Sequence, residues 1–212
     1  MKKRTRLLSL LLAVMFVLVA FAPMSVFAKS EDEDVATITV FSYAAMFDKG
    51  HAWIYFENKS DETLTIGAYK LEPGKAVSVG TYSNARKEGN GVYYNLDSYI
   101  VNHFNYKSRV SLTEGITKAE VKKLSDYINT HNTWSVTKNC TYFAEKMWNQ
   151  VSTKKIKGLG TPSYLKTTIK RYDEQTNKAM DDVSKKEVYK LKGSGNNTYL
   201  VNMRESAIHK KF

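Results

Sequence analysis

The hydrophobic pattern changes its period once along the chain, and this change limits the fold more than any other feature. Between residues 36 and 79 the apolar residues lie in short β-branched and aromatic runs, such as Thr37–Phe41 and His51–Phe56, which predict strands joined by polar turns. From Thr117 onward the apolar residues recur at helical spacing instead. The order predicts an α+β fold in which an antiparallel β-sheet packs against a few helices.

Capping residues predict where three helices start. Thr117 and Glu120 have the spacing of a capping box, and Thr161-Pro162 has the cap-then-proline order. Between them, Asn139 is a suitable N-cap for a helix with one inward-facing apolar stripe. That stripe consists of Cys140, Phe143, Ala144, Met147, Trp148 and Val151.

Short strands are expected at 187–191 and 198–201, so residues 173–212 are interpreted as an extension that packs on the same domain.

The first 28 residues have the three-part order of a secretory signal peptide. Four basic residues precede an apolar run, and the small-residue pattern Val26-Phe27-Ala28 ends the segment. An uncleaved membrane anchor is the alternative, but Pro23 and the cleavage pattern disfavour it. We therefore expect cleavage after Ala28, a disordered acidic leader over residues 29–35, and a protein that is secreted or associated with the cell envelope.

The positive charge of the chain survives the expected cleavage. Residues 1–28 hold four basic residues and no acidic one, so the net charge falls from +11 to about +7. A basic surface attracts peptidoglycan or another anionic envelope polymer, and it allows peripheral contact with an anionic membrane surface. Plain solubility explains such a charge equally well. Nucleic acid is not an expected partner, because export removes it. A basic band, interpreted first as a solvated face, comprises Lys154, Lys155, Lys157, Lys166, Lys170 and Arg171.

Cys140 is the single cysteine of the chain, so no internal disulfide can form. Directly after the N-cap Asn139, the positive end of the helix dipole favours the thiolate. The first position of an apolar stripe also suits a small buried hydrophobic residue. The residues alone leave both interpretations open.

A thiol nucleophile needs a base, and an imidazole titrates in the right range. Of the four histidines, His51 stands at the start of a predicted strand, where a rigid sheet would aim it. The alternative is that His51 has no catalytic role and is only a stacked or partly exposed residue of the strand. Four scattered histidines and one cysteine do not have the spacing of a zinc site, so we expect neither a metal nor another cofactor.

Two short blocks resemble a known superfamily. Residues 50–56, Gly-His-Ala-Trp-Ile-Tyr-Phe, and residues 139–144, Asn-Cys-Thr-Tyr-Phe-Ala, resemble the papain-like NlpC-type cell-wall peptidases. They are most similar to the circularly permuted branch that includes lecithin retinol acyltransferase-like proteins, in which the strand histidine precedes a helix cysteine in an Asn-Cys-x-x-Phe block. The resemblance covers about residues 36–172. It implies a permuted papain-like catalytic domain with Cys140 as the nucleophile and His51 as the base.

The resemblance also implies a polar third residue that orients the imidazole. Many permuted relatives have a second histidine on the following strand, but residues 63–70 contain none. If the hairpin turns at 58–62, Tyr69 lies opposite His51 and Thr65 shares its face. Tyr69, Thr65, Asn95 or a backbone carbonyl is then expected to orient the ring.

Two hypotheses follow from these features. The first is an exported cysteine hydrolase in which Cys140 and His51 act on an amide or ester bond. Backbone N–H groups near Asn139 would form the oxyanion hole. Cell-wall peptidoglycan is the first substrate candidate, and a lipid acyl group, hydrolysed or transferred, is the second. The other hypothesis is a wall- or partner-binding module that keeps the fold with weak or no activity, which the missing second histidine favours.

Overall fold

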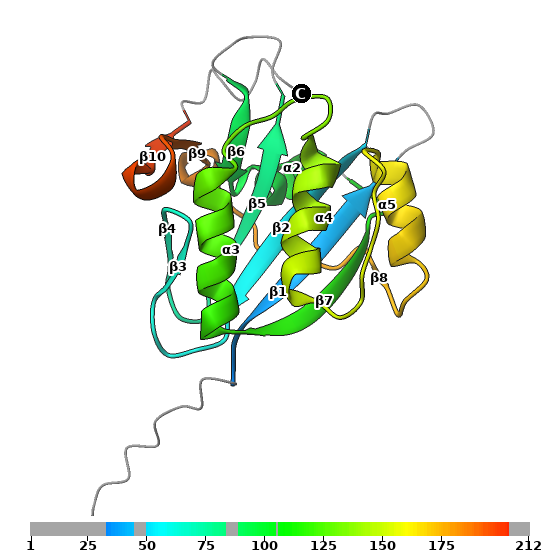
Figure 1. The fold of residues 1–212 in the computed structure, drawn as a ribbon, viewed down its shortest axis with the longest axis horizontal. Helices are drawn as coiled ribbons and strands as arrows, with labels where there is room; N and C mark the ends of the chain where they lie inside the picture. Colours follow the sequence, from blue (N-terminus) through cyan, green and yellow to red (C-terminus); the bar gives the residue numbers. More distant parts are fainter. Residues whose placement is uncertain (1–32, 45–49, 84–88, 105, 204–212) are drawn as a thin grey trace, which may run out of the picture. The chain divides into compact units, whose positions relative to one another are not determined.

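The structure is a computed structural model that describes residues 33–44, 50–83, 89–104 and 106–203. Within these ranges, one antiparallel sheet contains eight strands in the order β10-β9-β6-β5-β2-β1-β7-β8 (Figure 1). The predicted α+β architecture is therefore confirmed. The strands of this sheet are β1 (Asp34–Tyr43), β2 (His51–Asn58), β5 (Ala76–Tyr82), β6 (Gly91–Tyr94), β7 (Val110–Thr117), β8 (Gln175–Thr176), β9 (Tyr189–Lys192) and β10 (Tyr199–Asn202).

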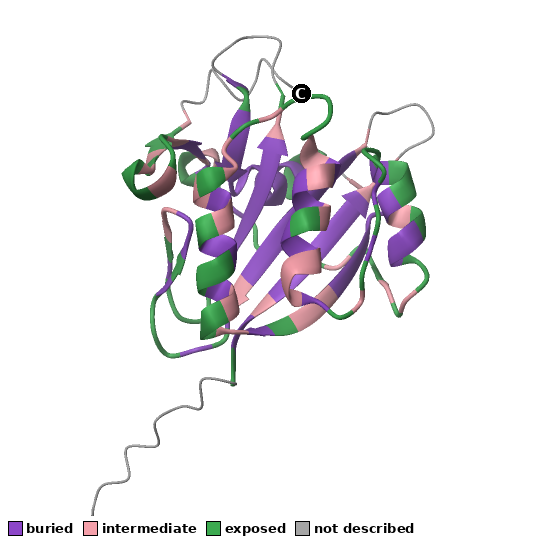
Figure 2. Cartoon of the chain, viewed as in Figure 1, coloured by how far each residue is buried: buried purple, intermediate pink, exposed green. Residues whose placement is uncertain are grey.

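Helices cover both faces of the sheet. Three of them, α3, α4 and α5, lie on the face that Figure 1 presents, and α2 lies behind β5. Alternate residues of the central strand β2 therefore enter different clusters: Ile54 packs in the core beneath α4, whereas Trp53 packs on the side of α2. Figure 2 shows that the central strands are buried over most of their length. The remaining elements are β3 (Leu64–Ile66), β4 (Tyr69–Leu71), α2 (Leu96–Phe104), α3 (Lys118–Thr130), α4 (Cys140–Val151), α5 (Pro162–Ile169), and the 3-10 turns η2 (Lys185–Glu187) and η3 (Gly195–Asn197).

The capping residues mark the predicted helix starts. Thr117 and Glu120 form a capping box at α3, and Thr161 caps α5 with Pro162 in its first turn. Asn139 caps α4. All three predicted starts are confirmed.

The leader prediction and the hairpin prediction need correction. β1 begins at Asp34, and Val35 is buried, so the predicted leader over 29–35 extends at least two residues too far. Residues 64–71 do not pair with β2 but fold back on themselves as the separate hairpin β3–β4. The turn at Gly67 has φ +61°, a conformation that glycine adopts without steric cost.

Three strands beyond residue 172, β8, β9 and β10, belong to the same sheet. β8 pairs with β7 at one edge, and β9 pairs with β6 near the other. The short strands predicted near 187–191 and 198–201 are both present, as β9 and β10. The predicted signal peptide, residues 1–28, lies outside the described residues. Among the residues that the structure describes, no helix is both long and apolar enough to cross a membrane.

Candidate active site

Cys140 is the first residue of α4. The Asn139 side chain accepts a hydrogen bond from the Tyr142 N–H at 3.1 Å, and its amide nitrogen donates to the Gly160 carbonyl at 2.8 Å. The helix start is thus fixed on both sides of the cap. Cys140 is a partly exposed free thiol, whereas the next members of the stripe, Phe143 and Ala144, are buried.

The sheet is open at the point where the thiol lies. The ladder between β2 and β5 runs from Glu57–Ala76 to Ile54–Val79, although β2 begins three residues earlier and β5 ends three residues later. In this unpaired stretch, the Ala52 backbone N–H forms a hydrogen bond with Cys140. The strand that carries the histidine therefore also holds the sulfur.

His51 is buried, with 8% of its surface exposed. Its Nε2 lies 2.9 Å from Oδ1 of Asp97. The ring stacks on Trp53 with centroids 5.7 Å apart and lies 4.3 Å from the Tyr82 ring. Its side chain also forms a hydrogen bond with Cys140. Since Nε2 faces the carboxylate, Nδ1 is the nitrogen left for the thiol.

A tight turn positions the carboxylate. Asn95 has φ +62°, which asparagine tolerates better than most residues, and its backbone N–H donates to the Ser78 carbonyl at 2.8 Å. The Ser98 N–H donates to the Ser78 hydroxyl at 3.0 Å. These bonds fix the first turn of α2 against β5. Asp97, in that turn, is only 2% exposed.

The thiol and the imidazole stabilise each other's charged forms. Burial opposes both charges and is the largest single influence on each group. Attraction to Cys140 and the bonds to Asp97 outweigh it at the imidazole and raise the pKa of His51 to about 10. Attraction to His51, with bonds from Ala52 and Thr141, outweighs it at the thiol and lowers the pKa of Cys140 below its usual value. Each group therefore favours the charged form of the other, thiolate beside imidazolium.

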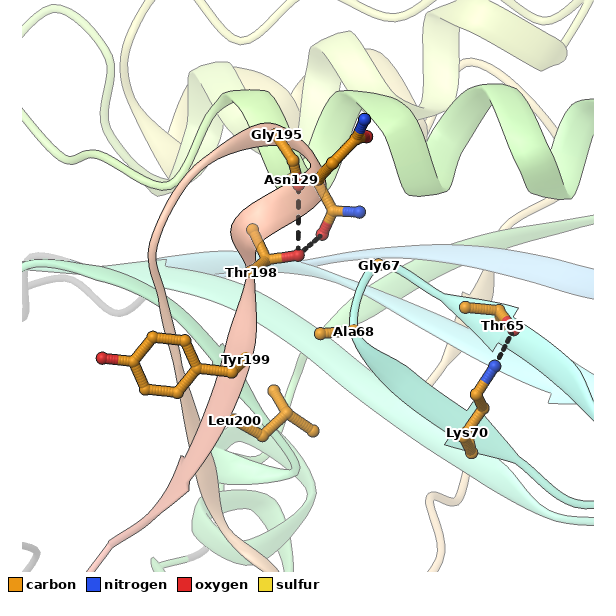
Figure 3. A pocket seen from close by; sticks show the side chains of 10 residues that line it. Thr65, Gly67, Ala68, Lys70, Asn129, Gly195, Thr198, Tyr199 and Leu200 are labelled. Atoms are coloured by element: carbon orange, nitrogen blue, oxygen red, sulfur yellow. Dashed lines mark hydrogen bonds between the residues drawn. The ribbon is translucent and has the colours of Figure 1, made fainter.

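Of the predicted site residues, the structure brings Cys140 and His51 together but places Tyr69 and Thr65 elsewhere. Because β5 and not residues 64–69 pairs with β2, Tyr69 lies opposite Ile66 in the β3–β4 hairpin and stacks on Tyr94. Thr65 accepts a hydrogen bond from Lys70 at 2.8 Å. It lines an open hollow of about 560 Å³ beside β10, and none of the lining residues is Cys140 or His51 (Figure 3). The predicted register that placed Tyr69 opposite His51 is wrong.

Asn95 is near the site but does not face the imidazole. Its side-chain nitrogen donates to the Glu187 carbonyl at 3.1 Å, and its oxygen accepts a long bond from the Ser78 N–H at 3.4 Å. Asn95 therefore holds the turn that places Asp97.

Asp97 is the site residue that sequence reasoning missed. The sequence analysis predicts no helix over residues 96–104, so it assigns no face to this acid. A signal was present: Leu96, Tyr99 and Ile100 have helical spacing, and Asp97 lies in the first turn of that pattern. An acid in such a segment is a candidate for burial with a partner.

No cluster of three or more side chains that could hold a metal ion occurs among the described residues. The chain matches no protein-family model, and searches of curated proteins and of solved structures also find no match.

Proposed function

We propose that the protein is a cysteine hydrolase in which Cys140 is the nucleophile, His51 transfers the proton, and Asp97 orients the imidazole. The convergence of these three side chains carries the proposal, because they come from three elements, α4, β2 and α2, and meet where the sheet opens. A thiolate beside an imidazolium is the reactive form of a catalytic cysteine.

The reaction uses each group in turn. The Cys140 thiolate attacks the carbonyl carbon of an amide or ester, and the negative charge moves to the carbonyl oxygen. The N–H groups of Cys140 and Thr141 precede the first bonds of the helix, so they are placed to bind that oxyanion. The His51 imidazolium gives its proton to the leaving amine or alcohol, which leaves a thioester on Cys140. Neutral His51 then takes a proton from water, whose oxygen attacks the thioester and releases the acid.

We propose an amide bond of cell-wall peptidoglycan as the first substrate and a lipid acyl ester as the second. The export signal expected in residues 1–28 and the basic composition support an envelope substrate. The missing second histidine favoured a binding module without activity. The proposed orienting role of Asp97 removes that objection, because a carboxylate orients an imidazole through the same type of bond.

The test uses the single thiol as its own reporter. Cys140 should react with iodoacetamide quickly at mildly acidic pH, and His51→Ala should slow this reaction at neutral pH because the base that ionises the thiol is gone. Cys140→Ser should fold normally and should not hydrolyse peptidoglycan fragments or acyl esters. His103→Ala is the matched control, since His103 is exposed and its Nδ1 lies 2.9 Å from the Tyr99 carbonyl oxygen.

The binding-module hypothesis predicts a different result. Under it, alkylation of the wild-type protein is slow and does not depend on His51. Cys140→Ser then lowers stability by about 1–3 kcal/mol, because it buries an unpaired hydroxyl. This pattern would rule out the hydrolase proposal.

A further inference from the structure

Two hydrogen bonds converge on one oxygen of the Asp97 carboxylate. His51 Nε2 lies 2.9 Å from Oδ1, and the Tyr82 hydroxyl also donates to Oδ1. The other oxygen, Oδ2, is buried without a hydrogen-bond partner among the described residues. The carboxylate therefore interacts with the histidine and the tyrosine through the same atom.

The fold brings Tyr82 to this position through the register of β5. The pairing of Ile54 with Val79, extended by three residues on each strand, places Tyr82 opposite His51. The Tyr82 ring lies 4.3 Å from the imidazole and edge-on to Tyr93 at 5.5 Å. Burial, followed by the charge of Asp97, raises the pKa of Tyr82 well above its usual value. The hydroxyl consequently stays protonated over the pH range in which a histidine titrates, and it remains a donor.

We propose that Tyr82 is a positioning residue whose hydroxyl shares Asp97 Oδ1 with His51 and so limits how strongly the carboxylate holds the protonated imidazole. Its importance for turnover rests on the proposed hydrolase function, but the effect on the histidine does not.

The physical reason lies in the charge at Oδ1. A hydroxyl that donates to a carboxylate oxygen stabilises part of its negative charge, which leaves less for a second donor. Without the hydroxyl, a fully charged buried carboxylate would bind the imidazolium more tightly. Such an imidazolium would be a weaker acid toward a leaving group. Tyr82 thus keeps His51 able to release its proton.

Few other titratable groups face the imidazole in the described part of the chain. Cys140 approaches it from α4, Asp97 from α2 and Tyr82 from β5. Tyr43, at the end of β1, is the register partner of His51. Tyr106 interacts with Tyr82 and packs edge-on against Tyr43.

The experiment measures protonation of His51 by NMR of isotope-labelled histidine in the Cys140→Ser background. This background removes the thiolate, so only the carboxylate and its partners act on the imidazole. Tyr82→Phe should move the His51 titration to higher pH, by a roughly 3- to 10-fold gain in proton affinity for one lost hydrogen bond. Tyr93→Phe is the matched control, because its hydroxyl bonds the Gly89 carbonyl at 2.6 Å. This control should leave the titration unchanged.

A second background separates the proposal from a packing effect. In Asp97→Asn the carboxylate charge is gone, so Tyr82→Phe should no longer move the His51 titration. An unchanged titration with Asp97 present, a shift to lower pH, or an equal shift in both backgrounds would overturn the proposal. Because no catalytic turnover is measured, these outcomes are independent of whether the protein is a hydrolase.

Discussion

Replacing Gly80 by alanine tests whether the position of the Asp97 carboxylate controls the histidine. Gly80 lies in β5 and pairs with Tyr93. A Cβ added there would lie 2.6 Å from Asp97 Oδ2 and 3.2 Å from Oδ1. Ordinary van der Waals contact begins at 3.4 Å, so the carboxylate must move by about 0.8 Å to accept a methyl group.

The size of the effect follows from the bond that this movement breaks. The His51–Asp97 bond is 2.9 Å long, and a displacement of that size directed away from the imidazole takes it beyond hydrogen-bond range. A hydrogen bond to a charged group contributes about 1.5–3 kcal/mol. His51 should therefore lose up to roughly 10- to 150-fold in proton affinity. Forcing a methyl group into a packed site should also lower the free energy of unfolding by about 1–3 kcal/mol.

The assay combines histidine NMR with thermal unfolding of Gly80→Ala, measured with and without Asp97→Ala. With Asp97 present, the His51 titration should move to lower pH and the melting temperature should fall. In the Asp97→Ala background the space is free, so the added methyl group should change neither quantity. Equal losses of stability in the two backgrounds would refute the reasoning, as would a His51 titration that Gly80→Ala leaves in place.

Two further predictions concern the third residue and the charged pair. Asp97→Asn should move the His51 titration to lower pH and reduce hydrolysis. Tyr69→Phe and Thr65→Ala should change neither quantity. If these two variants have an effect and Asp97→Asn has none, the prediction that Tyr69 or Thr65 orients the imidazole is correct after all. The second prediction is a pH dependence of stability. The raised pKa of His51 stabilises the fold fully below about 6.5, and this contribution is lost as the pH rises through about 10. The lowered pKa of Cys140 stabilises the fold fully above 9.0, and this contribution is lost as the pH falls through that lowered value. The melting temperature of the wild type should therefore exceed that of Cys140→Ser most between about pH 6.5 and 9, and a difference that does not depend on pH would contradict the charged pair.

The helix that carries the cysteine could be predicted because its signals are local. Asn139 is an N-cap that acts on the N–H of Tyr142, and the stripe from Phe143 to Trp148 repeats within one element. Each of these interactions spans three or four residues, so sequence spacing is enough to define it. The strand start at His51 is local in the same sense, since Gly50, with φ +66°, directly precedes it.

The third residue could not be predicted, because it depends on which strand pairs with β2. Two strand-like segments, residues 64–69 and 76–82, follow β2 in the sequence, and either is a possible pairing partner. Gly67 lets the first segment close on itself as a two-residue hairpin, which leaves the second, β5, to pair with β2. The partner of His51 is then set by a long-range register and by the turn at Asn95, and neither is visible in a local pattern.

The sequence leaves two interpretations of Cys140 open, a reactive thiol and a small buried hydrophobic residue. The structure accounts for both, because the residue lies at the boundary between the apolar core and the polar site. As the first residue of the α4 stripe, it lies where the helix leaves the apolar core, so its backbone is fixed by the packing of Phe143 and Ala144. Because the β2–β5 ladder stops at Ile54, the space beyond it is filled by groups that stabilise charge, namely the Ala52 N–H and the His51 imidazole. The core thus positions the sulfur, and the opening of the sheet provides its polar partners. A thiol buried only as a hydrophobic residue would need neither, since an uncharged sulfur gains little from an imidazolium. The unpaired end of the ladder is therefore the structural feature that favours a reactive cysteine over a buried one.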